Sequence, residues 1–432
     1  MLGRLFKGKL WSHGDFARFW AGQAISQFGT QVTVLAFPTI AILVLHATAF
    51  EVGLLGALEF LAFPVLGLFA GVTADRVRRR PILIGADLGR AAALASIPVA
   101  AYVGILTIYQ MYAVALLVGV FTVFFDVSYQ SYLPALIERK DLVEGNSKLE
   151  VSRSTAQVAG PGLAGFLIQF AGGAAAIIVD AVSYVGSALL IWLVRKPEPR
   201  PSPSPADGAP TSIFAELREG LQVVFGNPIL RRIVGCTATS NLGSNILFAV
   251  ALIFFYRRLQ LSPVQVGIVF SVGSIGGLVG AAVSATIARR LKVGPTIIAS
   301  CLLSSLYFAG LPAALLLPPV PVLTLAFILG TLGTTVYNVT QVSLRQAITP
   351  DRVQGRMNAT VRTVVWGTIP LGAVLGGILG TTIGVLPTVY ISGAVSLAAV
   401  LWVLGKPVRG LRDQPAPVEP APTLPEAAPG LG

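Results

Sequence analysis

Charged residues are scarce in this chain. Asp, Glu, Lys and Arg make up 12% of its 432 residues, whereas ordinary soluble domains carry about 25%. Hydrophobic residues make up 54%, the mean hydropathy is +0.77, and the apolar residues fall into long runs typical of membrane spans. This composition excludes a soluble enzyme, a disordered chain and a nucleic-acid-binding protein.

Cysteine and histidine are nearly absent. The two cysteines, Cys236 and Cys301, lie inside apolar runs, form no CxxC motif and offer no disulfide framework. The two histidines, His13 and His46, are too few for a histidine-based metal site. The chain also has no G-x-x-x-x-G-K-[ST] sequence for binding ATP phosphates. We therefore expect neither enzymatic activity nor a bound metal or other cofactor.

Twelve apolar segments are each long enough to cross a bilayer, which takes about 20 residues. Gly, Pro and charged residues separate them. Because lipid-exposed backbone must form its own hydrogen bonds, we expect the segments to be helices. Their predicted limits are 16–45, 51–73, 81–106, 109–135, 147–171, 174–195, 229–256, 263–288, 294–315, 320–345, 358–382 and 385–405.

A Pro- and Ser-rich stretch after Lys196 separates the first six segments from the last six, and its composition predicts a flexible linker. The Pro- and Ala-rich end of the chain predicts a disordered tail. The expected organisation is a cytoplasmic N-terminus (1–15), an N-terminal six-helix bundle (16–195), a cytoplasmic linker (196–228), a C-terminal six-helix bundle (229–406) and a disordered cytoplasmic tail (407–432).

Basic residues are concentrated in alternate loops, and this asymmetry explains the net charge of +12. Arg78 and Arg290, for example, lie in loops of the basic side, whereas the opposite side carries only Arg257 and Arg258. Under the positive-inside rule the basic side is cytoplasmic. We therefore expect an integral protein of the plasma membrane, the inner membrane of a bacterial cell, with both termini in the cytoplasm.

The two halves repeat each other weakly. Lys140–Gly145 precedes the fifth segment, and Pro350–Gly355 precedes the eleventh with an offset of 210 residues. Arg153 has a near counterpart in Arg362. Parallel six-helix repeats are the pattern of one large class of secondary transporter, which binds substrate between its halves.

The loop after the second segment reads GVTADRVRRR. It resembles motif A of the major facilitator superfamily, G-x-x-x-D-R-x-G-R-R, with Arg78 where the pattern has Gly. In such a motif glycine allows close helix approach, the acid accepts hydrogen bonds from a helix N-terminus and the arginines pair with acids. The resemblance implies a conformational gate, and a loop that serves topology alone is the alternative. The gate residues would be Gly71, Asp75, Arg76, Arg79 and Arg80.

The fifth segment contains GPGLAG. A nucleotide-binding reading of this GxGxxG is rejected because no strand precedes it. It resembles motif C of the superfamily's antiporters, with Ala164 in place of one glycine, and this implies tight helix packing at Gly160, Pro161 and Gly165. The same residues would also suit an ordinary packing contact between membrane helices.

Further stretches narrow the resemblance: FARFWAGQ in the first segment, DLGRA in the third, YLPAL in the fourth and DAVSY in the sixth. Together with motif A, this ordered series is similar to the drug:proton antiporter group, which includes macrolide efflux proteins and the enterobactin exporter. The resemblance is strongest over 16–195. It implies an all-helical membrane protein with twelve transmembrane helices in two pseudo-symmetric halves, the major facilitator fold. Proton coupling is implied by the family alone, because the fourth segment lacks the arginine of motif B.

Ionisable residues inside the spans cost free energy to insert and therefore mark candidate sites. Asp87 and Arg90 share one helix face, and we expect a structural ion pair. Asp126 is the first candidate for proton coupling because the fourth segment lines the central cavity in this fold. Glu59, in mid-span, is the second and Asp180 the third. Each acid would be structural if neighbouring hydroxyls or arginines hold it in place.

Amide and aromatic side chains recur on single faces of the expected cavity-lining helices. They would suit a bulky amphipathic or weakly cationic molecule, although amides also join helices to one another. The substrate-cavity candidates are Gln23, Gln27, Gln31, Phe28, Phe124, Asn241, Asn245, Asn338 and Gln341.

These features predict a secondary-active efflux transporter, a multidrug antiporter that exports amphipathic drug-like molecules by alternating access in exchange for protons. We expect it to act as a monomer whose partners are the lipid bilayer, a small-molecule substrate and protons. The alternatives are a dedicated exporter of a siderophore or other natural product, and a non-transporting membrane sensor on the same scaffold.

Overall fold

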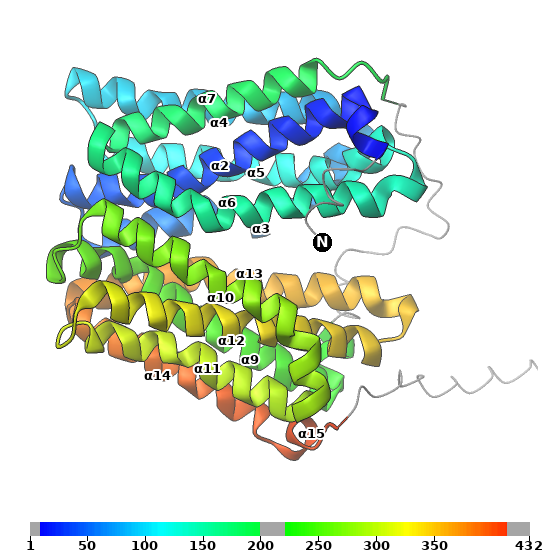
Figure 1. Cartoon of the computed structure of the whole chain (residues 1–432), viewed down its shortest axis with the longest axis vertical. Helices are drawn as coiled ribbons and strands as arrows, with labels where there is room; N and C mark the ends of the chain where they lie inside the picture. The colour runs from blue at the N-terminus through cyan, green and yellow to red at the C-terminus, as the bar shows by residue number, and fades with distance from the viewer. Residues whose placement is uncertain (1–8, 199–220, 413–432) are drawn as a thin grey trace, which may run out of the picture.

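The computed structural model describes residues 9–198 and 221–412, and its ordered elements are helices (Figure 1). The N-terminal half begins with a short turn, η1 (Lys9–Ser12). Its long helices are α2 (Gly14–Leu43), α3 (Ala49–Arg76), α4 (Arg79–Val103), α5 (Ile108–Leu136), α6 (Leu142–Ala171) and α7 (Gly173–Trp192), with η2 (Arg139–Asp141) before α6.

The C-terminal half begins with α9 (Pro228–Ile253), which continues as a π-helical turn, η3 (Phe254–Arg258). The remaining helices are α10 (Pro263–Leu291), α11 (Val293–Ala313), α12 (Pro319–Ile348), α13 (Asp351–Thr382), α14 (Val385–Val403) and the short α15 (Lys406–Arg409). The predicted architecture of two six-helix halves is therefore confirmed.

Eleven of the described helices are long and apolar enough to cross a membrane. The remaining long helix, α6, has 30 residues but carries Glu144, Lys148, Glu150 and Arg153 in its first half. These charges, together with glycines further on, lower its hydropathy. It nevertheless packs between α2 and α10 as a full member of the bundle.

Most predicted helix limits lie within three residues of the observed ones. The exceptions are α6 and α13, which begin at Leu142 and Asp351, where the sequence predicts 147 and 358. Their first turns are polar, and hydropathy therefore misses them. A helix continues beyond the apolar stretch as long as its backbone hydrogen bonds are made and no breaker intervenes.

Ordered structure also extends past the predicted start of the tail at 407. Val408 is fully buried, and the Gly294 N–H donates to the carbonyl of Leu411 (2.9 Å). In the predicted linker, residues 221–226 are helical. The parts of the predicted N-terminus, linker and tail that fall on 1–8, 199–220 and 413–432 lie outside the described residues.

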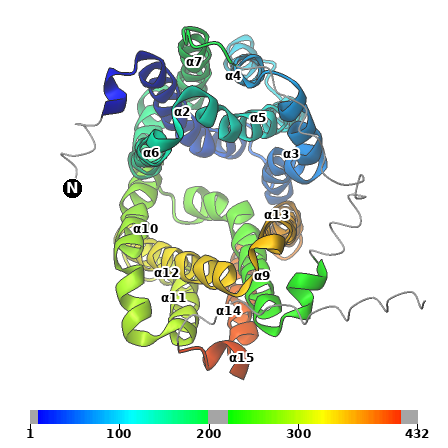
Figure 2. The same ribbon diagram turned by 90° about the vertical axis from the view of Figure 1, so that its right-hand side faces the viewer.

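The helices of both halves run side by side, and the bundle has two ends (Figure 1). We call the end where α2 begins and α14 finishes the terminal end; Figure 2 views the bundle from there. The opposite, distal end carries the loops 44–48 and 254–262. Capping boxes start a helix there in each half, with Thr48 and Glu51 on α3 and Ser262 and Gln265 on α10.

The apolar core differs between the two ends. A large buried cluster joins the halves, with Val32 and Ile40 of α2 packed in the same cluster as Phe254 and Phe255 of η3. Nearer the terminal end each cluster belongs to a single half. Two lie in the N-terminal half, one of them built around Phe19, and the third lies in the C-terminal half. The halves are therefore most closely packed at the distal end.

Candidate functional site

Two pairs of helices form the contact between the halves, and both rely on small residues. A Cβ at Gly165 of α6 would meet the carbonyl of Pro263 and the Cα of Gly267 on α10. A Cβ at Gly53 of α3 would likewise meet the backbone of α13 at Gly377. We call these contacts the α6–α10 seam and the α3–α13 seam. They place motif C at the interface, with Gly165 as a point of close helix approach.

The other motif C residues contribute on both sides of α6. Gly160 packs against the Gln31 side chain of α2, inside the N-terminal half. The carbonyl of Pro161 lies where a Cβ on Gly267 would have to go, and the Gly162 N–H donates to Ser271 Oγ (2.7 Å). Pro161 has no N–H to donate and its ring disturbs the helix hydrogen bonds around it, so nearby backbone groups can make contacts outside the helix.

Hydrogen bonds reinforce the contact at the distal end. The hydroxyl oxygens of Thr39 and Tyr256 lie 2.9 Å apart across the interface. Arg257 donates to the carbonyls of Ile42 (3.2 Å) and Ala47 (2.8 Å), where α2 ends. Sequence reasoning noted Arg257 only as a rare basic residue on this side, and that rarity was the available signal for its role.

A buried ion pair occupies the interior of the N-terminal half. Asp87 and Arg90 of α4 pair directly, and both are buried. The Arg90 guanidinium lies over two rings, with 4.3 Å to the centroid of Phe125 and 4.1 Å to that of Tyr184. Arg90 is therefore held by groups from α4, α5 and α7. These contacts agree with the structural role expected for the pair.

Asp180 is fully buried where α7 meets α2. Its carboxylate accepts a hydrogen bond from Ser183 Oγ (3.0 Å) and fills the space that a side chain at Gly29 would take. At the next residue of α2, the hydroxyl group of Thr30 lies 2.9 Å from that of Tyr184. Asp180 is thus built into the α2–α7 contact.

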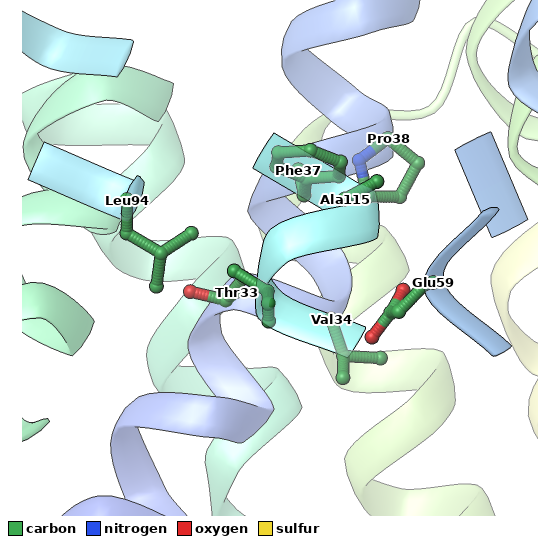
Figure 3. A pocket seen from close by; sticks show the side chains of 8 residues that line it. Thr33, Val34, Phe37, Pro38, Glu59, Leu94 and Ala115 are labelled. Carbon is green, nitrogen blue, oxygen red and sulfur yellow. The ribbon is translucent and has the colours of Figure 1, made fainter. Parts of the chain in front are cut away.

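Glu59 lies in a different environment, beside a cavity of about 30 Å³ between α2, α3, α4 and α5. This exceeds the ~10–15 Å³ that one water molecule needs. Figure 3 shows the carboxylate directed from α3 toward Val34; Phe37, Leu94 and Ala115 also line the space. Within the described residues Glu59 forms no hydrogen bond or ion pair, and Asp180 is the charged group that acts on it.

Asp126 on α5 is half-buried and, within the described residues, makes no hydrogen bond or ion pair. Two guanidinium groups act on its charge: Arg90 of the same half and Arg362 on α13 of the other half. The structure therefore connects Asp126 electrostatically to both halves, whereas no arginine or lysine among the described residues acts in this way on Glu59.

Motif A makes its described contacts inside the N-terminal half. The backbone N–H groups of Arg79 and Arg80 donate to the Glu198 carboxylate (2.8 and 2.9 Å), which caps α4. The Arg80 side chain donates to the carbonyls of Ile191 and Trp192, where α7 ends. Glu198 was missed from the sequence because it lies at the edge of a Pro-rich stretch predicted to be flexible.

The remaining motif A residues are Gly71, Arg76 and Asp75. Among the described residues, no atom of another helix lies within 4 Å of the position that a Cβ on Gly71 would take. The close helix approach expected there is wrong for this conformation, because the halves pack closely at the distal end instead. Arg76 is exposed. The side chain of Asp75 lies outside the described residues.

The predicted amides divide by environment. Gln23 on α2 and Gln341 on α12 are buried, and Nε2 of the first and Oε1 of the second have no hydrogen-bond partner within the described residues. Asn245 donates to the Asn241 carbonyl (2.8 Å) and packs against α13. Asn338 is exposed. The half-buried candidates are Gln27, Phe28, Gln31, Phe124 and Asn241.

No group of three or more metal-ligating side chains occurs in the parts of the chain that the structure describes. The chemistry available inside the bundle is therefore that of carboxylates, arginines, amides and aromatic rings. Such groups can bind a proton and an organic molecule without a covalent step.

The chain shares sequence with characterised exporters along most of its length. It is 26% identical over 374 residues to the multidrug efflux pump Tap of Mycolicibacterium fortuitum, covering 83% of this chain and 88% of Tap. It is 25% identical over 415 residues to the enterobactin exporter EntS of Salmonella typhi, covering 94% and 95% of the two chains.

The fold is shared with a bacterial homologue of the iron transporter ferroportin, at 17% identity over 90% of this chain and 98% of that one. The TM-score is 0.73 to its inward-facing state and 0.56 to its outward-facing state, at 16% identity and the same coverage. The sequence profile of the Major Facilitator Superfamily matches residues 19–367. The chain belongs to the Major Facilitator Superfamily of membrane transporters, as its sequence motifs predicted.

Proposed function

We propose that this protein is a secondary-active exporter of amphipathic small organic molecules, which works by alternating access in exchange for protons. The observation that carries the proposal is that the halves meet through two small-residue seams at one end, while an acid without a cationic partner lies inside one half. The seams allow one half to rock on the other. The acid supplies a place for the driving proton.

The terminal end would face the cytoplasm of a cell whose plasma membrane holds the protein as a monomer. The charge asymmetry of the loops supports this orientation. The shared apolar cluster at the distal end and the separate clusters nearer the terminal end support an inward-facing conformation. The higher TM-score to an inward-facing relative agrees with it.

Glu59 is the group that we assign to the proton. Inserting an ionised carboxylate at the centre of a membrane helix costs roughly 2.5–3.5 kcal/mol. Asp126 can offset this cost through Arg90 and Arg362, and Asp87 through its ion pair. Glu59 lines the cavity beside Thr33 and apolar side chains, and the charged group that acts on it is Asp180, itself an acid. No positive charge of the described residues stabilises its ionised form, and the adjacent cavity has room for one water molecule.

Substrate would bind between the halves, against aromatic rings and amide side chains. Gln23 Nε2 and Gln341 Oε1, which lack a partner within the described residues but are buried in this conformation, would become accessible during the transport cycle. Relatives carry names of two kinds, a multidrug efflux pump and an enterobactin exporter. The second name supports, as an alternative, an exporter dedicated to one natural product.

The test is reconstitution of the full chain in liposomes with an imposed pH gradient. Movement of rhodamine 6G, a cation, and of carboxyfluorescein, an anion with the same ring system, is followed by fluorescence. We expect gradient-dependent movement of at least one dye, lost when an ionophore collapses the gradient. Movement that survives collapse would instead indicate a facilitator.

Glu59→Gln should abolish the gradient dependence while leaving the protein folded. The matched control is Glu138→Gln, which changes an exposed acid paired with Lys140 near the terminal end. If Glu59→Gln kept gradient-driven movement at the wild-type rate and Asp126→Asn lost it, the driving proton would be assigned to Asp126 instead of Glu59.

A further inference from the structure

Arg362 lies on the face of α13 that is turned to the other half. Trp366, Ala373 and Gly377 follow it at intervals of four, seven and four residues, which keeps all four on one side of a helix. Ala373 and Gly377 form the α3–α13 seam. Arg362 therefore points between the halves rather than into lipid, although it is exposed.

One aromatic ring lies against this arginine, and further rings pack behind that ring. Its guanidinium carbon lies 4.1 Å from the centroid of the Trp366 ring. Trp366 in turn makes an edge contact with Phe63 of α3, at 5.3 Å between centroids, and Phe60 stacks on Phe63 at 6.1 Å. The guanidinium is thus backed by a ring of its own helix, which a ring of α3 in the other half contacts in turn, about a third of the way along α13.

The repeat counterpart of Arg362 shows that this charge is unusual. Arg153 on α6 has an acid one turn before it and forms a two-pronged ion pair with Glu150 (2.9 and 2.7 Å). At the same spacing, Arg362 has Ala359. Within the described residues Arg362 forms no hydrogen bond or ion pair, and its charge acts across the interface on Asp126.

We propose that Arg362, Trp366 and Phe63 form a subsite for an aromatic organic anion, with the anionic group on the guanidinium and the ring against the two aromatic side chains. A guanidinium without a carboxylate partner offers five donors in a planar fork. Trp366 and Phe63, which meet edge to face, offer ring surfaces that favour a planar ligand body. Asp126 competes with the ligand for Arg362, because both are anions that act on the same charge.

This inference deepens the proposed export function by naming the substrate class, but binding can be tested without transport. The full chain in lipid nanodiscs is titrated into carboxyfluorescein and, separately, into rhodamine 6G, with fluorescence anisotropy as the readout. The two dyes share a xanthene ring system and differ in charge. We expect the wild-type protein to bind the anion more tightly.

Arg362→Gln should weaken carboxyfluorescein binding by about tenfold or more, and Arg362→Lys by less. Rhodamine 6G binding should not weaken in either variant. Asp126→Asn should strengthen carboxyfluorescein binding several-fold because the competing anion is gone. Arg153→Gln, at the repeat position, should leave both dyes unaffected. Circular dichroism and gel filtration check that each variant is folded.

Three results would overturn the subsite: no carboxyfluorescein binding to the wild-type protein, equal binding to Arg362→Gln, or an equal loss in Arg153→Gln. If any of these three results occurs and gradient-driven movement of rhodamine 6G is still seen, the export function stands and the subsite is rejected. Arg362-dependent binding without gradient-dependent transport of either dye would keep the subsite and reject the exporter.

Discussion

The hydroxyl groups of Thr39 and Tyr256 lie 2.9 Å apart, and they join the two halves across the distal end. Thr39 donates its own proton to the Leu35 carbonyl (2.6 Å), and so Tyr256 is the donor in the pair. Arg257, the next residue, binds the end of α2. This π-helical turn thus supplies several of the hydrogen bonds that join the halves at this end, together with the one from the Phe50 N–H to Thr381 Oγ1 (2.9 Å).

Removing these bonds should open the distal end. Hydrogen bonds from a charged donor are worth about 1.5–3 kcal/mol, and so Arg257→Ala should shift the equilibrium toward the outward-open state by roughly tenfold or more. Spin labels at positions 102 and 316, which are exposed at this end in opposite halves, report the distance. Cys236 and Cys301 are replaced by serine in the background used for labelling.

The matched control for that measurement is Arg258→Ala. Arg258 is adjacent, exposed and equally charged, but it makes no hydrogen bond within the described residues. If the distance distribution is unchanged in Arg257→Ala, or changes equally in both variants, the hydrogen bonds of Arg257 do not keep the halves together at the distal end.

Gly29→Ala should destabilise the N-terminal half. A Cβ there would collide with the Asp180 carboxylate and Ser183, and forced overpacking costs about 1–3 kcal/mol. Gly186→Ala on α7 is the control, because nothing lies within 4 Å of its Cβ position. Alanine favours a helix by up to about 1 kcal/mol over glycine. The apparent Tm in detergent should therefore fall for the first variant and not for the second.

Glu198→Ala should loosen the terminal end of the N-terminal half. Its carboxylate accepts from two backbone N–H groups at the start of α4, and losing such a cap costs about 0.5–2 kcal/mol. Glu138→Ala removes an exposed ion pair instead, which is worth about 0–1 kcal/mol. A larger fall in the apparent Tm for Glu198→Ala is expected, and equal values would mean that the cap contributes little.

Proton binding by Glu59 has a direct readout in proteoliposomes that contain a pH-sensitive dye. Driving substrate out through the wild-type protein should bring protons in. In Glu59→Gln this proton movement should disappear, because the amide cannot take up a proton. Proton movement at the wild-type rate in this variant would show that the coupling group lies elsewhere.

The sequence predicted the helices and the i,i+3 relation of Asp87 and Arg90 because both depend on local periodicity. It could not predict which faces meet. Thr39 and Tyr256 are 217 residues apart, and nothing near either one indicates the other. Asp126 and Glu59 looked alike as isolated acids in apolar segments. Only the packed bundle shows that arginines act on Asp126 and that a small cavity adjoins Glu59.

The two seams have a consequence for how transporters of this design diversify. At Gly53, Gly165, Gly267 and Gly377 the contact is between backbones, so these four positions can move against one another without a change of rotamer. Residues such as Arg362, Trp366 and Gln341 take no part in these backbone contacts. If such residues bind substrate, as we propose, substitutions there would alter the cargo and leave the seams intact. New specificities would then arise from a few replacements in an unchanged helix framework.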